Sequence, residues 1–232
     1  MPIMTDRLSD AQSGLRLWGL GTVRTIRPLW ALLELEIPFT HEEILTRTPS
    51  METDVYRNVS PRQKIPMFDD GELRIGESAA ICLYLADRYR DSVTLTPNAG
   101  SAARAIHDEL CWFAMTEMDS VLYTIRRHEG LPLVYGESKV AVDSARDYFI
   151  RSSGEIERRL SDGRKYLVDS AFSVADILVK SCLDWASIYK IELPEASQAY
   201  AHRLSERPAF QEAMKQNFTP KAMAALAGDP KS

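Results

Sequence analysis

The stretch KIPMFDDGELRIGES, from Lys64 to Ser78, contains residue types that could bind a small anion. Glu77 and Ser78 stand where a helix is expected to begin. The unpaired N–H groups and the dipole at a helix start favour a carboxylate, and Glu77 could accept a hydrogen bond from an ammonium group. A ligand with an amino acid at one end would therefore satisfy both residues. The alternative is that Ser78 is a plain N-cap.

Pro66 opens a short strand in this stretch, after which the chain turns at Asp70-Gly71 and enters the helix. This order resembles thioredoxin-like modules, whose cis proline presents the backbone of the preceding residue outward. The resemblance implies that Pro66 is cis and that the N–H and C=O of Ile65 are free to pair with an extended peptide. The alternative is a trans proline at an edge strand, since only about 5–6% of X–Pro bonds in folded proteins are cis.

The elements that must position these residues follow from the hydrophobic pattern of the first third of the chain. It predicts a strand at 15–18, a helix whose face carries Ile26, Leu29, Trp30 and Leu33, a strand at 39–44 and an irregular helix at 50–59. Two brief strands then surround Asp70-Gly71, a dipeptide suited to a tight hairpin, and a helix runs from Glu77 to near Arg90. The predicted order is β-α-β-α-β-β-α.

Strand signals stop after this segment, and the remainder reads as helical. One helix is predicted over 102–127, another over 139–160, and a third after FSVADI, where Ser173 and Asp176 have the spacing of a capping box. The predicted organisation is a flexible leader at 1–13, an α/β domain at 14–91, a linker at 92–101, an all-helical domain at 102–222 and a tail at 223–232. A cleft is expected between the two domains.

The composition is that of an ordinary globular protein. The 232 residues carry a net charge of -5 without a dense Lys/Arg run, which argues against a nucleic-acid partner. No segment approaches the roughly 18 apolar residues of a membrane helix, and the leader lacks the apolar core of a signal peptide. Three cysteines lie far apart, so neither disulfides nor a metal site is indicated, and a reducing cytoplasm is predicted.

Three stretches, in this order, resemble the glutathione transferase superfamily: GTVRTIRPLWALLELEIPF, SPRQKIPMFDDGELRIGESAAICLYLADRY and FSVADILV. The resemblance spans nearly the whole chain. It implies a thioredoxin-like α/β N-terminal domain followed by an all-α C-terminal domain, and a cytoplasmic homodimer. It also implies that glutathione, as co-substrate, is held by Ile65, Pro66, Glu77 and Ser78.

The resemblance further implies that a hydroxyl or thiol after the first strand meets the glutathione sulfur. Matching to theta-like and zeta-like members through EIPF puts Thr22 at that position. Matching to beta-like members puts Arg24 on their cysteine and Thr25 on the following serine. A hydrogen bond donated by such a hydroxyl, with the nearby helix start, would lower the thiol pKa from its usual value of about 8.5. The alternative for Thr22 is a simple helix cap.

Further positions are assigned to the two ends of the site. Lys64 matches a family position that binds the glycine carboxylate of glutathione. Arg47 and His41 are further candidates, for which a solvated surface charge is the alternative. Candidates for the electrophile pocket are Trp112, Met115, Thr116 and Tyr123. Aromatic and Met residues at helical spacing are, however, more often core.

The sequence therefore predicts a glutathione transferase that activates the thiol for attack on a small apolar electrophile, in a detoxification role. One alternative is a glutathione-dependent isomerase or disulfide reductase. Another is a non-catalytic, binding member of the superfamily. The lack of a cysteine near Thr22 disfavours a mixed disulfide on the protein itself.

Overall fold

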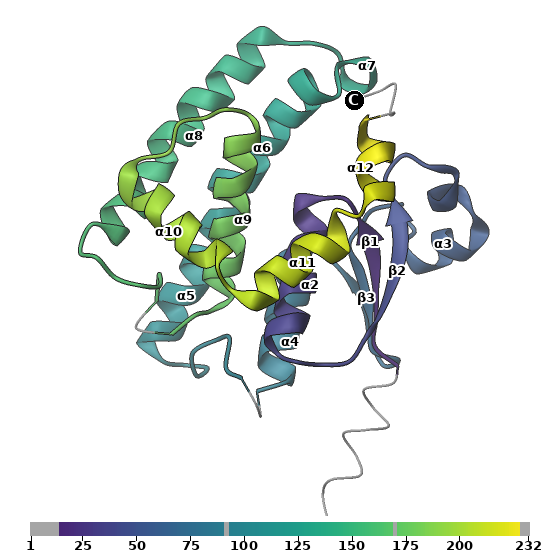
Figure 1. Cartoon of the computed structure of the whole chain (residues 1–232), viewed down its shortest axis with the longest axis horizontal. Helices are drawn as coiled ribbons and strands as arrows, with labels where there is room; N and C mark the ends of the chain where they lie inside the picture. Colours follow the sequence, from purple (N-terminus) through teal and green to yellow (C-terminus); the bar gives the residue numbers. More distant parts are fainter. Residues whose placement is uncertain (1–13, 91–92, 169–170, 228–232) are drawn as a thin grey trace, which may run out of the picture. The chain divides into compact units, whose positions relative to one another are not determined.

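The chain forms two compact units in the structure, a computed structural model that describes residues 14–90, 93–168 and 171–227. Of the described residues, the first unit comprises those up to Val93 together with Ala209–Ala225, and the second comprises those from Thr94 to Pro208 and 226–227. The first is α/β and the second is helical, as predicted (Figure 1). The leader expected at 1–13 lies outside the described residues.

The first unit is built on a four-stranded mixed sheet with the order β2-β1-β3-β4. Its strands are β1 (Arg16–Leu20), β2 (Thr40–Leu45), β3 (Met67–Asp69) and β4 (Arg74–Gly76). β1 runs parallel to β2 and antiparallel to β3, and β3 runs antiparallel to β4. The parallel pair requires a crossover, which α2 (Val23–Glu34) supplies. The predicted element order is confirmed.

Helices cover both sides of this sheet (Figure 1). α2 and α4 (Ser78–Arg88) pack together on one side, and η1 (Pro49–Glu52) and α3 (Asp54–Val59) lie on the other. On the α3 side, Ile65 packs against a buried apolar cluster. The cluster consists of Trp18, Met51, Tyr56, Val59 and Met67. The side chain of Ile65 is thereby anchored to the core next to the strand that Pro66 opens.

The last two helices, α11 (Pro208–Asn217) and α12 (Pro220–Ala227), belong for most of their length to the α/β unit. The ring of Phe210 packs edge-on against Trp30 of α2 at a centroid distance of 4.8 Å. The Nζ of Lys221 lies 2.8 Å from the carboxylate of Glu43. The division into units therefore differs from the predicted all-helical domain at 102–222 and tail from 223. The reason is that the buried ring of Trp30 packs against Phe210, a residue of this segment.

The second unit contains α5 (Ala102–Phe113), η2 (Ala114–Asp119), α6 (Ser120–Ile125), η3 (Arg126–Gly130), α7 (Pro132–Tyr135), α8 (Lys139–Leu160), α9 (Val174–Ile188) and α10 (Glu195–Ser205). α8 spans the predicted residues. The single helix predicted over 102–127 is interrupted by η2 and ends in η3, and both of these are π-helical. A π-helical turn holds more residues than an α-helical one, so each insertion rotates the helix faces that follow it.

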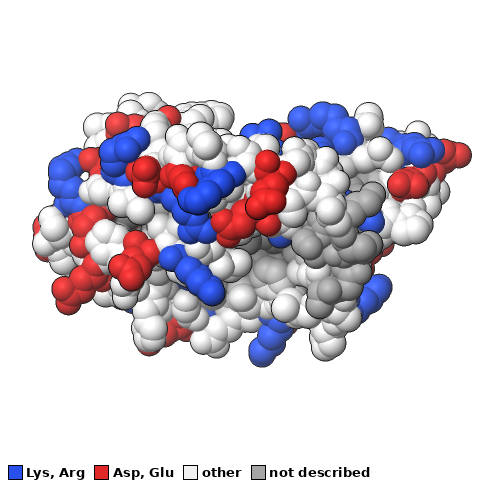
Figure 2. Space-filling model, turned by 90° about the horizontal axis from the view of Figure 1, so that it is seen from above, with Lys and Arg blue, Asp and Glu red and all other residues white. Residues whose placement is uncertain are grey.

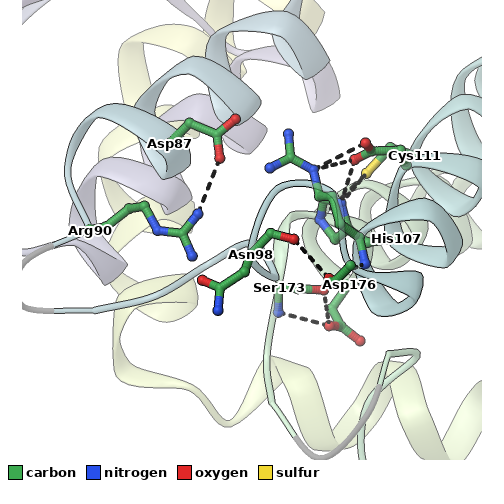
Figure 3. Close-up of polar contacts among 10 residues, drawn as sticks. Asp87, Arg90, Asn98, His107, Cys111, Ser173 and Asp176 are labelled. Carbon is green, nitrogen blue, oxygen red and sulfur yellow. Dashed lines mark hydrogen bonds and ion pairs between the residues drawn. The ribbon is translucent and has the colours of Figure 1, made fainter.

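The start of α9 is closed by its own side chains. The carboxylate of Asp176 accepts hydrogen bonds from the N–H and the hydroxyl of Ser173, both at 2.9 Å (Figure 3). It also accepts from the N–H of Leu167 at 2.9 Å and from the hydroxyl of Tyr200 at 2.8 Å. The predicted capping box is confirmed. Burial raises the pKa of Asp176 overall, although these donors lower it.

The surface carries charges of both signs. Figure 2 shows Lys and Arg side chains interspersed with Asp and Glu over the face in view. None of the helices in the described ranges has the length and apolar character needed to cross a membrane.

Candidate functional site

The peptide bond between Ile65 and Pro66 is cis, as predicted. The main chain of Lys64, the residue before Ile65, is fixed by hydrogen bonds. Its N–H donates to the hydroxyl of Ser60 at 3.0 Å. Its carbonyl accepts from the hydroxyls of Ser60 and Tyr56, at 3.0 and 2.8 Å. Burial raises the pKa of Tyr56 to about 12, so this hydroxyl is a donor at neutral pH. The pairing of β1 with β3 extends only to Met67, which leaves the main chain of Ile65 outside the ladder.

Two threonine hydroxyls lie in contact where β1 leads into α2. Thr22 is the N-cap of α2, and its Oγ1 accepts from the N–H of Thr25 at 3.0 Å. The two Oγ1 atoms are 2.8 Å apart, within hydrogen-bond distance. Thr25 is completely buried, whereas Thr22 is partly exposed. Thr22 is thus a helix cap, the alternative reading of its sequence position, and in addition shares a hydrogen bond with the second threonine.

Gly19 brings these hydroxyls close to the cis peptide. A Cβ placed on Gly19 would lie 2.9 Å from Oγ1 of Thr25 and 3.2 Å from Cβ of Ile65. Its φ of +138° is also unfavourable for any residue with a side chain. The ring nitrogen Nε2 of His41 is 2.7 Å from the carbonyl of Gly19. The structure therefore gathers Thr25, Ile65 and His41 around one glycine at the end of β1.

The start of α4 has no side-chain cap. Its N-cap is Glu77, which has φ 68° and ψ 112° and makes no capping hydrogen bond through its side chain. Ser78 is the first helical residue, so the alternative of Ser78 as a plain N-cap is wrong. Positive φ is uncommon for a residue with a side chain and is found preferentially at functional sites. The exposed carboxylate of Glu77 is ion-paired with Arg62 at 2.9 Å.

A buried guanidinium lies behind Ser78. Arg27 of α2 is completely buried, and its Nη1 donates to Oγ of Ser78 at 3.1 Å. Burial raises the pKa of Cys82 on α4 to about 12, even though the charge of Arg27 lowers it. The Cys82 thiol is therefore neutral at physiological pH and unsuited to be a nucleophile. The positive charge of Arg27 instead polarises the hydroxyl at the start of α4.

The candidates for binding the glycine carboxylate are exposed side chains. Lys64 and Arg47 are both exposed, and Arg47 has a positive φ of 57° just after β2. The main chain of Lys64 is fixed next to Ile65 by the bonds of Ser60 and Tyr56 described above. A role for either cation stays a prediction. His41, in contrast, is tied to Gly19 and so belongs to the same corner as the threonines.

The residues predicted for the electrophile pocket lie in the helical unit, from the end of α5 to α6. Trp112 is 61% exposed, Thr116 is exposed, and Met115 and Tyr123 are half-buried. None of the four therefore belongs to the buried core, which was the alternative for them. The hydroxyl of Thr116 donates to the carbonyl of Trp112 at 3.0 Å, and the Tyr123 hydroxyl lies 3.3 Å from that of Tyr135.

A second group of potentially reactive residues lies on α5 (Figure 3). Nδ1 of His107 is 2.9 Å from the carboxylate of Asp108, and both ring nitrogens are near the Cys111 sulfur, at 3.7 and 3.9 Å. A sulfur almost equidistant from both nitrogens does not lie in line with either one. His107 and Cys111 are also buried. This geometry does not suit proton transfer from a thiol to imidazole.

Among the described residues, no group of three or more His, Cys, Asp or Glu side chains is placed to hold a metal ion.

Comparison with known proteins assigns both units to one family. Residues 24–93 match the family model "Glutathione S-transferase, N-terminal domain", and residues 113–208 match "Glutathione S-transferase, C-terminal domain". The chain belongs to the glutathione transferase superfamily.

Individual relatives are distant. Glutathione S-transferase hmp2 of Hypomyces subiculosus is 28% identical over 70% of this chain and 78% of its own length. Glutathione S-transferase theta-1 of Rattus norvegicus is 27% identical over 61% of this chain, and the match spans 60% of the rat protein. A solved structure of the glutathione transferase URE2P8 from Phanerochaete chrysosporium, with oxidized glutathione, matches with a TM-score of 0.77 at 20% identity, over 91% of this chain and 97% of that one. This last similarity supports the fold.

Several residues of the site were not identified from the sequence, and Arg27, Arg62 and Asn217 are three of them. Arg27 could have been suspected, because an arginine within the buried run of α2 needs an acceptor. Arg62 has no such signal, since it reads as an ordinary surface charge. The third is Asn217, whose amide contacts the loop at Gly21 and Thr22. It lies almost 200 residues from that loop, so no local pattern could connect the two.

Proposed function

We propose that this protein is an active glutathione transferase in which the hydroxyl of Thr22 activates the glutathione thiol for attack on a small apolar electrophile. The thiol loses its proton to solvent, the thiolate forms a bond to carbon, and the leaving group departs with the bonding electron pair. Catalysis then consists of stabilising the thiolate and placing it against the electrophile.

The observation that carries this proposal is the hydrogen bonding of Thr22. Its oxygen accepts from the N–H of Thr25 and lies 2.8 Å from the Thr25 hydroxyl. If the buried Thr25 hydroxyl donates, both lone pairs of the Thr22 oxygen are used and its proton is available to an outside acceptor. A hydroxyl that accepts hydrogen bonds is also a stronger donor. Because Thr22 is partly exposed, its hydroxyl suits the role of hydrogen-bond donor to the glutathione sulfur. The completely buried Thr25 suits the role of donor to the Thr22 oxygen.

The corner at Ile65 and the start of α4 fits the rest of glutathione. The main chain of Ile65 would pair with the cysteinyl peptide of the ligand. The Ser78 hydroxyl and the first N–H groups of α4 would bind the carboxylate of the γ-glutamyl end, while Glu77 would accept from its ammonium group. Because Arg27 donates to the Ser78 oxygen, the Ser78 proton is directed to another acceptor. Lys64 or Arg47 would face the glycine carboxylate.

The test compares Thr22→Ala with Thr25→Ala and Thr22→Ser. Thr22→Ala should keep glutathione affinity nearly unchanged, because Ile65, Glu77 and Ser78 bind the peptide. It should raise the pKa of the bound thiol and lower conjugation about 10- to 100-fold, a loss of about 1.4 to 2.7 kcal/mol. Thr25→Ala should have the smaller effect, and Thr22→Ser should retain much of the activity.

The measurement is the pH dependence of conjugation against a panel of apolar electrophiles, with a disulfide substrate assayed in parallel. A shift to higher pH in Thr25→Ala alone would assign the acid to Thr25. Disulfide turnover without conjugation would favour the reductase alternative. A wild-type protein that does not bind glutathione would contradict the proposal.

A further inference from the structure

The loop between β1 and α2 is held by a residue from the far end of the sequence. Asn217, the last residue of α11, is completely buried. Its Oδ1 accepts a hydrogen bond from the N–H of Gly21 at 3.0 Å, and its Nδ2 donates to the carbonyl of Thr22 at 2.9 Å. One side-chain amide therefore binds the main chain of two adjacent residues, and the second of these carries the hydroxyl assigned above to thiol activation.

These contacts exceed what the buried main chain needs for satisfaction. The N–H of Gly21 also lies 2.9 Å from the main-chain carbonyl of Asn217. The carbonyl of Thr22 accepts from the N–H groups of Thr25 and Ile26, at 3.1 and 3.3 Å. Both groups would thus keep a partner without the Asn217 side chain. What that side chain adds is a two-point constraint on the position and rotation of the loop.

The segment that carries Asn217 is itself anchored to the α/β unit on both sides of that residue. Before it, the ring of Phe210 packs against Trp30 of α2 at 4.8 Å between centroids. After it, Lys221 pairs with Glu43 of β2 at 2.8 Å. Asn217 is therefore presented from a fixed helix end, which is what a group that orients another residue requires.

We propose that Asn217 is a positioning residue for thiol activation and acts through Thr22. This inference rests on the proposed function, and Asn217 itself need not touch the ligand. The direction in which the Thr22 hydroxyl donates depends on the rotation of its main chain, which Asn217 fixes. Misplacement of a reacting group by about 1 Å can lower a rate by roughly 100-fold.

The test uses Asn217→Leu, which keeps a similar side-chain volume and removes both hydrogen bonds. The matched control is Gln216→Ala, because the Gln216 side chain donates to Glu212 of the same helix, at 3.0 Å. For each protein, the ionisation of bound glutathione is followed against pH by the ultraviolet absorbance of the thiolate. Glutathione affinity and urea unfolding are measured in parallel.

Asn217→Leu should change glutathione affinity less than about threefold and raise the pKa of the bound thiol by about one unit, a tenfold smaller ratio of thiolate to thiol. Gln216→Ala should leave that pKa unchanged. In a Thr22→Ala background, Asn217→Leu should add no further shift, because its effect passes through Thr22. Asn217→Ser, whose side chain is too short to span both groups, should shift the pKa in the same direction and serves if Asn217→Leu does not fold.

A purely structural role would lower the stability of Asn217→Leu or Asn217→Ser without moving the thiol pKa, and that result would overturn the inference alone. So would a full additional shift in the Thr22→Ala background. A wild-type protein that binds glutathione without lowering its thiol pKa would overturn the proposed function and this inference together.

Discussion

The two helix starts at α4 and α9 are built in opposite ways. At α9, the carboxylate of Asp176 is buried and accepts four hydrogen bonds, two of them from Ser173. At α4, the N-cap Glu77 makes no side-chain capping bond, has a positive φ, and directs an exposed carboxylate toward Arg62. Both starts combine a serine with an acidic residue, yet only at α9 do these side chains cap the helix that they begin.

This difference distinguishes a helix start closed by its own side chains from one without a side-chain cap. The first N–H groups of any helix need acceptors, which come from side chains, water or a ligand. At α9, the side chain of Ser173 supplies part of these acceptors, and the helix start is buried in the core. α4 has no side-chain capping bond, and we propose that glutathione supplies the acceptor there, next to the unfavourable backbone conformation of Glu77. The physical expectation is that changes at α9 affect stability and changes at α4 affect binding.

The largest effect is expected for Asp176→Ala. It would leave donors from Leu167, Ser173 and Tyr200 buried without their acceptor, at a cost of about 3 to 5 kcal/mol in the free energy of unfolding. Urea denaturation would measure it. Asp143→Ala is the control, because Asp143 forms an exposed ion pair with Lys139 and its loss should change stability by less than about 0.5 kcal/mol.

The comparison also requires that Asp176→Ala, under conditions where it remains folded, binds glutathione as the wild type does. Equal stability of Asp176→Ala and Asp143→Ala would show that the α9 start is not a structural cap.

A smaller effect, of the opposite kind, is expected for Ser78→Ala. Loss of a hydrogen bond to a charged carboxylate should weaken glutathione binding roughly 10- to 100-fold. The free energy of unfolding should fall by about 1.5 to 3 kcal/mol, the usual value of a hydrogen bond that involves a charged group such as Arg27. Isothermal titration and urea denaturation measure the two quantities.

Ser161→Ala serves as the matched control, since the Ser161 hydroxyl donates to the carbonyl of Arg158 at an exposed helix end. It should change neither quantity appreciably. If Ser78→Ala lowered stability as strongly as Asp176→Ala and left affinity unchanged, the contrast between the two helix starts would be lost.

The smallest effect is expected for Arg62→Ala. The ion pair with Glu77 is exposed on both sides, so its removal should change stability by less than about 1 kcal/mol. Glutathione affinity should stay the same or rise up to about threefold, because Glu77 would then face the ligand ammonium without a competing cation. Titration at low and high salt checks this, with Arg57→Ala as control, an exposed pair with Asp54 on α3. A tenfold loss of affinity would mean that Arg62 itself binds the ligand.

Local signals in the sequence were sufficient for much of the fold. The spacing of apolar residues and the dipeptide Asp70-Gly71 predicted the β-α-β-α-β-β-α order, and Ser173 with Asp176 predicted the capping box. These succeed because hydrophobic periodicity, turns and caps depend on residues within a few positions of one another. The cis bond at Pro66 needed the resemblance to a known module as well, because the local sequence alone favours trans.

Only the tertiary structure decided which residues surround the predicted site. The sequence determined that Thr22, Thr25, Ile65 and Ser78 are candidates, but it could not indicate that Arg27 lies behind Ser78 or that Asn217 binds the loop at Thr22. It also assigned 209–222 to the helical domain, whereas Phe210 packs on Trp30 of the α/β unit. The reason is physical: a buried guanidinium or amide takes its partner wherever the folded chain supplies one, and separation along the sequence carries no information about that choice.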